Sequence, residues 1–359
     1  MTAQQATRPL TGLGFAVAFG AATIVSVPPL MADEVSFKSK TISIIVSSNP
    51  GGGTDGAARL VGTHLAKYLP GTPTVIYRNL PGGSGIKANN YFYDRVEPNG
   101  LTLLSGSREQ LSPIKLLNEA SKYNPAKYEF IGGFSRASSP IVIRVRDKGR
   151  LLDPTAKPLV FGDPSGERTA AQATLWGKEY LGWNVRFVLG YASSPAAVMA
   201  FRSGETDMAS SFLLEPYMIS DGLEVIADLG AQSEDGTRVL PHPQFPGTPL
   251  FDELIRPRLD AAGRKAYEIW LADQLVDKWL ALPPKTPEAV VDAYRKAFLA
   301  LVKDPNFIES ATDLFDKDFT WLFAARLKEV VMAQTAITRD DLLFFDGLRK
   351  KNGLPVLDR

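Results

Sequence analysis

The chain has 359 residues, of which 45% are hydrophobic and 22% charged, a composition typical of a globular protein long enough for two domains. Its 40 Lys and Arg residues nearly balance its 39 Asp and Glu residues, so nucleic acid is not expected as a partner. The absence of cysteine excludes disulfides, thiol nucleophiles, thiolate metal sites and the lipid-attachment cysteine of a bacterial lipoprotein.

The first 32 residues have the pattern of a secretory signal peptide. Arg8 is their only charged residue, and an uncharged run over 9–32 precedes Asp33 and Glu34. We expect cleavage after Ala32 and export to the periplasm. The alternative is a retained N-terminal anchor, although the apolar centre is short for a membrane span of ~20 residues. Loss of Arg8 leaves 40 − 1 = 39 basic residues against 39 acidic ones, a formal charge of zero.

The segment that follows predicts an α/β unit. Its hydrophobic periodicity indicates strands and helices in alternation, namely strand 41–48, helix 54–69, strand 74–79, helix 86–95 and strand 100–107. Such an order implies a parallel sheet with right-handed crossovers. The polar loops after the three strands should therefore meet at one edge of the sheet.

A second α/β unit is predicted in the middle of the chain. It comprises strands 139–145, 158–162, 185–191, 206–212 and 224–230, with helices 170–181 and 195–204. The segment 231–249 is rich in Pro and Gly and reads as a return connection. After it we expect only helices, near 263–280, 286–304 and 323–337, because Tyr267, Leu271, Leu275 and Trp279 recur at helical spacing.

The loop after the first strand carries the motif G-x-G-x-x-G at Gly51, Gly53 and Gly56. One hypothesis is a dinucleotide site, with Arg78 at the end of the second strand taking the 2′-phosphate of NADP. The other is a carboxylate held by the backbone N–H groups at the start of the helix. The export signal favours the carboxylate, since the periplasm does not supply free NADP.

Several motifs resemble the Bug family, the periplasmic substrate-binding receptors of tripartite tricarboxylate transporters. The resemblance is carried by 49-NPGGGTDGAAR-59, 79-NLPGGSGIKA-88, 98-PNGLTLLSGS-107, 190-GYASSPAAVMAFRSGETDMA-209 and 282-LPPKTPEAVV-291. The chain departs from the family pattern at Leu80, Ser84, Glu167, Arg168 and Ala170.

This resemblance implies an α/β fold of the two-lobed type II periplasmic binding kind, a clamshell with two crossover segments. Lobe 1 would begin with residues 33–138, lobe 2 would be residues 139–230, and residues 231–359 would supply the return loop and the C-terminal helices that complete lobe 1. The expected function is capture of a small organic anion by a monomer that delivers it to membrane transporter subunits. A periplasmic ligand sensor for a signalling system would look the same in sequence.

The resemblance also implies which loops hold the ligand. These are the first loop, with Ser48, Gly52, Gly53, Thr54 and Asp55, and the lobe 2 loop, with Ser165, Gly166 and Thr169. Asp55 is better explained as an acid favoured in the first helical turn. Arg108 and Arg168 follow predicted strands and are candidates for pairing with a second carboxylate. Further candidate polar contacts lie near strand ends or the crossover: Ser107, Ser138, Tyr191 and Ser211.

No constellation in the sequence indicates catalysis. We find no nucleophile with a base and no carboxylate pair in separated environments. His64 and His242 are isolated, so they do not suggest a metal site. We therefore expect a binding protein without catalytic residues, metal or cofactor, the alternative being an NADP-dependent oxidoreductase that uses the Gly51–Gly56 loop.

Overall fold

The computed structural model describes residues 1–2, 35–211, 214, 222–233, 238–315 and 319–356. Residues 3–32 of the predicted signal peptide, with its cleavage site, lie outside the described residues. Residues from Val35 onward form one compact unit. Among the described helices, none combines the length and apolar character that a membrane span needs.

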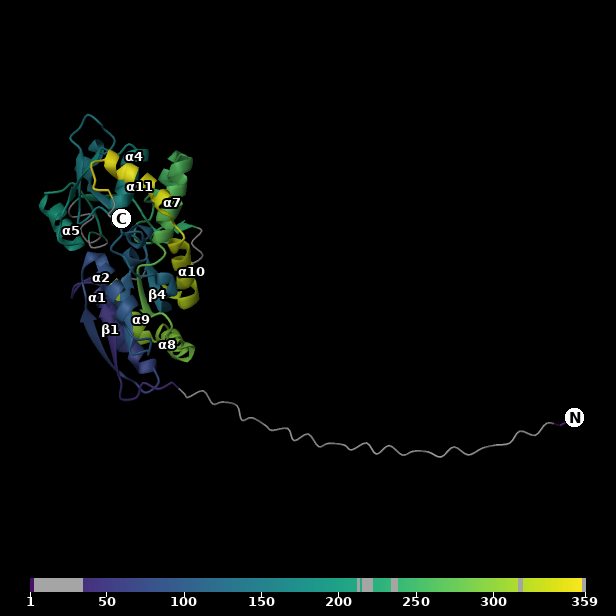
Figure 1. Cartoon of the computed structure of the whole chain (residues 1–359). Helices are drawn as coiled ribbons and strands as arrows, with labels where there is room; N and C mark the ends of the chain where they lie inside the picture. Colours follow the sequence, from purple (N-terminus) through teal and green to yellow (C-terminus); the bar gives the residue numbers. More distant parts are fainter. Residues whose placement is uncertain (3–34, 212–213, 215–221, 234–237, 316–318, 357–359) are drawn as a thin grey trace. The chain divides into compact units, whose positions relative to one another are not determined.

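Two β-sheets organise this unit (Figure 1). The first has the strand order β13-β4-β12-β3-β1-β2, with bounds β1 Thr41–Val46, β2 Thr74–Asn79, β3 Thr102–Ser107, β4 Glu129–Arg136, β12 Lys278–Leu282 and β13 Phe319–Phe323. The second has the order β7-β6-β8-β5-β9, with bounds β5 Ile141–Arg144, β6 Leu159–Asp163, β7 Val185–Leu189, β8 Met208–Ser210 and β9 Leu223–Ala227. Each sheet with the helices packed on it is called a lobe: lobe 1 for the first sheet and lobe 2 for the second. A small pair, β10 Ala231–Gln232 and β11 Val239–Leu240, follows β9.

Lobe 1 contains the predicted β-α-β-α-β unit. Strand β1 pairs in parallel with β2 and with β3, and α1 Gly53–Leu65 and α2 Ile86–Arg95 are the crossover helices. Helix α1 packs its Ala58, Val61 and Leu65 against buried residues of β1 and β3. The C-terminal ends of the three strands therefore share one edge of the sheet.

The prediction of helices alone after residue 249 is wrong. Helix α7 ends at Asp273, and Trp279 lies in β12, which pairs antiparallel with β3 and β4. Four of the five residues of β12 are buried, because neighbours cover both faces of the sheet. A strand that is buried on both faces shows no alternation of apolar and polar residues, so hydrophobic periodicity alone does not distinguish it from a buried helix. Strands β4 and β13 were missed as well.

The later helices divide between the two lobes. Lobe 1 takes α8 Glu288–Leu301, α9 Pro305–Phe315 and α10 Ala324–Thr335. Lobe 2 takes α6 Phe251–Ile255, α7 Ala261–Asp273 and α11 Arg339–Lys351, which join α4 Thr169–Tyr180 in its core, and Figure 1 shows α4, α7 and α11 lying together. The expected assignment of all of 231–359 to lobe 1 is thus corrected, because helix periodicity reveals a buried face but not the sheet that buries it.

The return of the chain from lobe 2 to lobe 1 lies later in the sequence than expected. The chain enters lobe 2 at 137–140, where the Ser138 amide donates to the carbonyl of Gly230 at 2.8 Å. It returns to lobe 1 at 274–277, between α7 and β12, and α11 then passes back to lobe 2. The first crossover matches the predicted boundary, whereas the return lies more than one helix later than residue 231.

Candidate ligand-binding site

The glycine loop after β1 is held by Asp55. Its Oδ2 accepts from the Gly51 amide at 2.9 Å and from Nε of Arg59 at 3.0 Å, and its Oδ1 accepts from Nδ2 of Asn79 at 2.8 Å. Burial raises the pKa of Asp55, but the hydrogen bonds from Arg59, Gly51 and Asn79 outweigh it and lower that pKa below its ordinary value. Asn79 also donates to the Ser48 carbonyl at 3.0 Å. The Asp55 carboxylate is therefore a buried part of the loop.

The first turn of α1 offers a place for an anion. Gly52 is the N-cap residue and has no capping side chain. Within the part of the chain that the structure describes, the Gly53 and Thr54 amides have no hydrogen-bond partner. A methyl group on Gly53 would lie 3.9 Å from Cε of Lys278. The partial positive charge of the helix terminus thus lies beside a lysine.

The loops after β1, β2 and β3 meet at Gln110, as predicted. Its Oε1 accepts from the Ser47 hydroxyl at 3.2 Å and from the Ser107 amide at 2.6 Å, and its Nε2 donates to the Ser84 carbonyl at 2.8 Å. Gly85 has a φ of +95°, and a Cβ there would lie 2.6 Å from Gln110. A glycine is required at this position by its conformation and by the space available.

Charged side chains surround the ends of β3 and β12. The Ser107 hydroxyl donates to Oε2 of Glu109 at 2.6 Å. Burial raises the pKa of Glu109, but this hydrogen bond and the charges of Lys278, Arg108 and Arg168 lower it overall. Glu109 is thus an anion that lies among cations from both lobes.

Asp277 forms ion pairs with two basic side chains beside this cluster. It pairs with Lys278 and, at 3.0 Å, with Nε of Arg136. Burial raises the pKa of Asp277, yet Lys278, Arg136 and Arg108 hold it well below the ordinary range of an aspartate. Lys278 keeps 12% of its side chain exposed.

The lobe 2 loop before α4 is satisfied internally. Asp163 Oδ1 accepts from the amides of Ser165 and Gly166 at 3.1 and 2.7 Å. The Gly166 carbonyl accepts from Nε2 of Gln172 at 3.0 Å and from Nη1 of Arg349 at 2.7 Å. Both polar backbone groups of Gly166 are therefore occupied, and the Ser165 hydroxyl accepts from the Glu167 amide at 3.3 Å.

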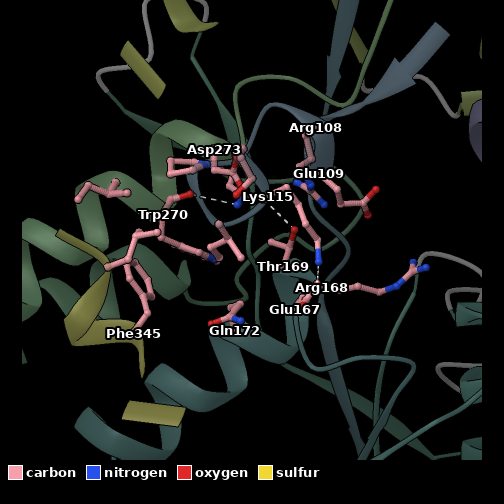
Figure 2. Close-up of a pocket in the computed structure, with 16 residues that line it drawn as sticks. Arg108, Glu109, Lys115, Glu167, Arg168, Thr169, Gln172, Trp270, Asp273 and Phe345 are labelled. Atoms are coloured by element: carbon pink, nitrogen blue, oxygen red, sulfur yellow. Dashed lines mark hydrogen bonds and ion pairs between the residues drawn. The ribbon is translucent and has the colours of Figure 1, made fainter. Parts of the chain in front are cut away.

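Two contacts join the lobes around a pocket (Figure 2). Oε1 of Gln274 accepts from the Thr169 hydroxyl at 2.7 Å and also from Arg108. Nζ of Lys115, on α3 Pro113–Leu116, lies 3.0 Å from Oε2 of Glu167. The pocket is lined by residues of the segments 108–115, 167–172 and 269–274, with Leu342 and Phe345 of α11.

The structure gathers some of the predicted site residues and separates others. Arg108, Arg168 and Thr169 line the pocket, and Nη1 of Arg168 donates to the Ser194 hydroxyl at 2.5 Å. Tyr191 lies within lobe 2, where its hydroxyl donates to Oε1 of Glu205 at 2.6 Å. Three further predicted residues lie at strand ends or the crossover and do not line the pocket: Ser107, which supports Glu109, Ser138 between β4 and β5, and Ser211 just after β8.

The residues of the site that sequence reasoning missed include five charged or polar ones: Glu109, Lys115, Asp273, Gln274 and Lys278. The first two follow a predicted strand end and could have been chosen on that signal. Gln274 and Lys278 were hidden because the predicted helix 263–280 extends past the end of α7, of which Asp273 is the last residue.

The glycine loop is poorly suited to a dinucleotide. The Gly51 amide, which a diphosphate would need, is taken by the Asp55 carboxylate. Arg78 instead stacks on the ring of Tyr91, 5.1 Å from its centroid. These contacts leave neither the first glycine nor Arg78 free for a dinucleotide.

No protein-family model matches the sequence, and no curated protein matches it either. Solved structures do match. A TctC solute-binding protein from Polaromonas, crystallised without ligand, is 18% identical with a TM-score of 0.60, over 88% of this chain and 100% of that one. The periplasmic binding protein BugD is 21% identical with a TM-score of 0.57, over 88% and 98%. Rpa4515 of R. palustris, solved with adipate, is 16% identical with a TM-score of 0.60, over 87% and 97%. These likenesses confirm the expected two-lobed binding-protein fold.

Proposed function

We propose that this chain is a periplasmic solute-binding receptor that captures a small organic acid between its lobes and delivers it to the membrane subunits of a tripartite tricarboxylate-type transporter. It acts as a monomer, without metal or cofactor, and catalyses no reaction. The observation that carries this proposal is the first turn of α1, where the Gly53 and Thr54 amides have no partner among the described residues and a Cβ on Gly53 would lie 3.9 Å from Cε of Lys278.

The ligand carboxylate accepts hydrogen bonds from these two amides and from Nζ of Lys278. Hydrogen bonds to a charged group contribute about 1.5–3 kcal/mol each, and micromolar binding requires about 8 kcal/mol in total. Three such bonds, with contacts from Ser165 and Arg168 of lobe 2, are enough to offset the free-energy cost of closing the lobes. The ligand therefore favours the closed state. The adipate in the R. palustris neighbour supports a carboxylate as ligand.

Isothermal titration of the purified protein with mono-, di- and tricarboxylates, and with NADP, tests this function. We expect micromolar binding of one carboxylate class and a loss of about tenfold or more in affinity for Lys278→Gln, the value of one charge-assisted hydrogen bond. Lys296→Gln, on the exposed face of α8, is the matched control and should bind normally. Binding of NADP alone, or an unchanged affinity of a folded Lys278→Gln variant, would refute the proposal.

Export and delivery require separate measurements. The N-terminal residue of protein recovered from the periplasm should be Asp33, just after the expected cleavage site. Uptake of the bound acid by cells should require both this protein and the transporter's membrane subunits. Uptake that persists without the membrane subunits would leave binding intact and overturn the delivery step.

A further inference from the structure

Glu109 is linked to the first turn of α1 through Ser107 and Lys278. Ser107 and Lys278 are direct partners across the antiparallel pair of β3 and β12, and residues paired in this way have Cβ atoms about 5 Å apart. The Ser107 hydroxyl donates to Oε2 of Glu109 at 2.6 Å, and a Cβ on Gly53 would lie 3.9 Å from Cε of Lys278. Lys278 is therefore next to both the proposed carboxylate site and the residue that holds Glu109.

Glu109 carries a negative charge at neutral pH. Burial raises its pKa, but a hydrogen bond from Ser107 and three nearby cations lower that pKa below the ordinary value of a glutamate. These cations are Lys278, Arg108 and Arg168. The first two belong to lobe 1, and Arg168 precedes α4 in lobe 2. The carboxylate of Glu109 thus already provides an anion for cations of both lobes.

The lining of the pocket between the lobes includes the basic side chains of Arg108, Lys115 and Arg168 (Figure 2). Lys115 pairs with Glu167 at 3.0 Å, whereas the two arginines donate to neutral side chains. The arginines are therefore the cations that a second carboxylate of a ligand would approach. Glu109 lines the same pocket and already compensates their charge.

Asp273 shows how Glu109 affects a neighbouring carboxylate. It lines the same pocket, at the end of α7. Burial raises the pKa of Asp273 to about 7; the charge of Arg108 opposes this rise, and the charge of Glu109 adds to it. Glu109 thus already disfavours a further negative charge at this pocket. A second carboxylate of a ligand would experience the same repulsion.

We propose that Glu109 determines the charge class of the ligand. Its carboxylate takes the place of a second ligand carboxylate. The cleft therefore binds an acid with one carboxylate, held at α1 and Lys278, and rejects a dicarboxylate of the same length. This inference rests on the proposed function, because it names which acids the same cleft accepts. A purely structural role for Glu109 predicts instead a loss of stability with no change in the preference between acids.

The test is titration calorimetry on the purified protein at neutral pH with matched acids. Succinate, glutarate and adipate are each compared with the monocarboxylate of equal chain length, which is butyrate, pentanoate or hexanoate. We expect the wild-type protein to bind one monocarboxylate at least about tenfold more tightly than its matched dicarboxylate, because like charges brought together at a partly buried site repel strongly. Glu109→Gln keeps an acceptor for the Ser107 hydroxyl and should reduce this preference by about tenfold or more, since the repelling charge is removed.

Two further variants separate charge from structure. Glu109→Asp keeps the negative charge and should restore the preference that Glu109→Gln loses. Glu129→Gln is the matched control, since Glu129 pairs with Arg295 at 3.6 Å and lies outside the pocket lining. It should show the same preference as the wild type. Urea unfolding without ligand measures whether each variant is folded.

A wild-type protein that binds each dicarboxylate as tightly as its matched monocarboxylate overturns the inference while the proposed function stands. So does a folded Glu109→Gln variant with an unchanged preference, which would assign Glu109 a structural role. If Glu109→Gln does not fold, the comparison in the wild type still decides. If none of these acids binds, both proposals fall.

Discussion

Nζ of Lys115 lies 3.0 Å from Oε2 of Glu167, and this ion pair joins the short helix after β3 of lobe 1 to the loop before α4 of lobe 2. The side chains are only 11% and 25% exposed. Glu167 is also one of the positions at which the chain departs from the Bug pattern. The pair is therefore a contact between the lobes that the resemblance did not lead us to expect.

We predict that Glu167→Gln destabilises the protein by about 1–3 kcal/mol, because it leaves a nearly buried Lys115 without its carboxylate. The midpoint of urea unfolding measures this loss. Glu179→Gln is the control, since its partner Lys351 is 66% exposed and such pairs contribute less than about 1 kcal/mol. Equal losses of unfolding free energy in the two variants would show that the ion pair between the lobes stabilises the protein no more than an exposed pair does.

Asp55 should make the stability of the protein depend on pH in the acid range. Its pKa is lowered on folding, so its contribution is fully present above its unfolded pKa of about 3.9 and is lost as pH falls through the folded value. The wild-type protein should therefore lose more stability between pH 6 and pH 3 than Asp55→Asn does. Urea unfolding at the two pH values measures the difference. Parallel losses in both proteins would contradict the expectation.

The glycine at position 85 should be required for space as well as for conformation. Gly85 and Gly182 both have positive φ, but only at Gly85 would a Cβ meet a neighbour, Gln110 at 2.6 Å. Gly182→Ala should cost about 1 kcal/mol from backbone strain alone. Gly85→Ala should cost about 2–4 kcal/mol, because the clash adds to the strain. Chemical unfolding of both variants decides the matter, and similar losses would mean that Gln110 moves aside at little cost.

Arg349 should stabilise the lobe 2 loop from the C-terminal helix. Its guanidinium donates to the carbonyls of Gly166 and Pro355, both at 2.7 Å, and the residue is 1% exposed. Arg349→Met should reduce the free energy of unfolding by roughly 2–4 kcal/mol, since two charged hydrogen bonds are lost.

Arg264→Met, at an exposed position of α7, is the matched control and should stay within about 0.5 kcal/mol of wild type. Hydrogen exchange of the backbone amides of 163–169 should rise in Arg349→Met only. Unchanged exchange there would show that α11 stabilises the lobe without holding the loop.

Much of lobe 1 could be predicted because its signals are local. The alternation of β1, α1, β2, α2 and β3 is visible in hydrophobic periodicity and in the glycine-rich turns between them. The convergence of the three loops followed from the handedness of crossovers, and Gln110 confirms it. The carboxylate-binding role of the α1 turn, in contrast, stays a prediction.

The sequence by itself determined that strands and helices alternate in two α/β units that follow one another. Only the tertiary structure decided that residues 278–282 form a strand and that α7 and α11 pack on lobe 2. It alone placed Lys278 near the first turn of α1, and Trp270 and Gln172 in the lining of one pocket. The physical reason is that an apolar residue is buried wherever a complementary surface meets it, and the identity of that surface depends on chain segments more than a hundred residues away.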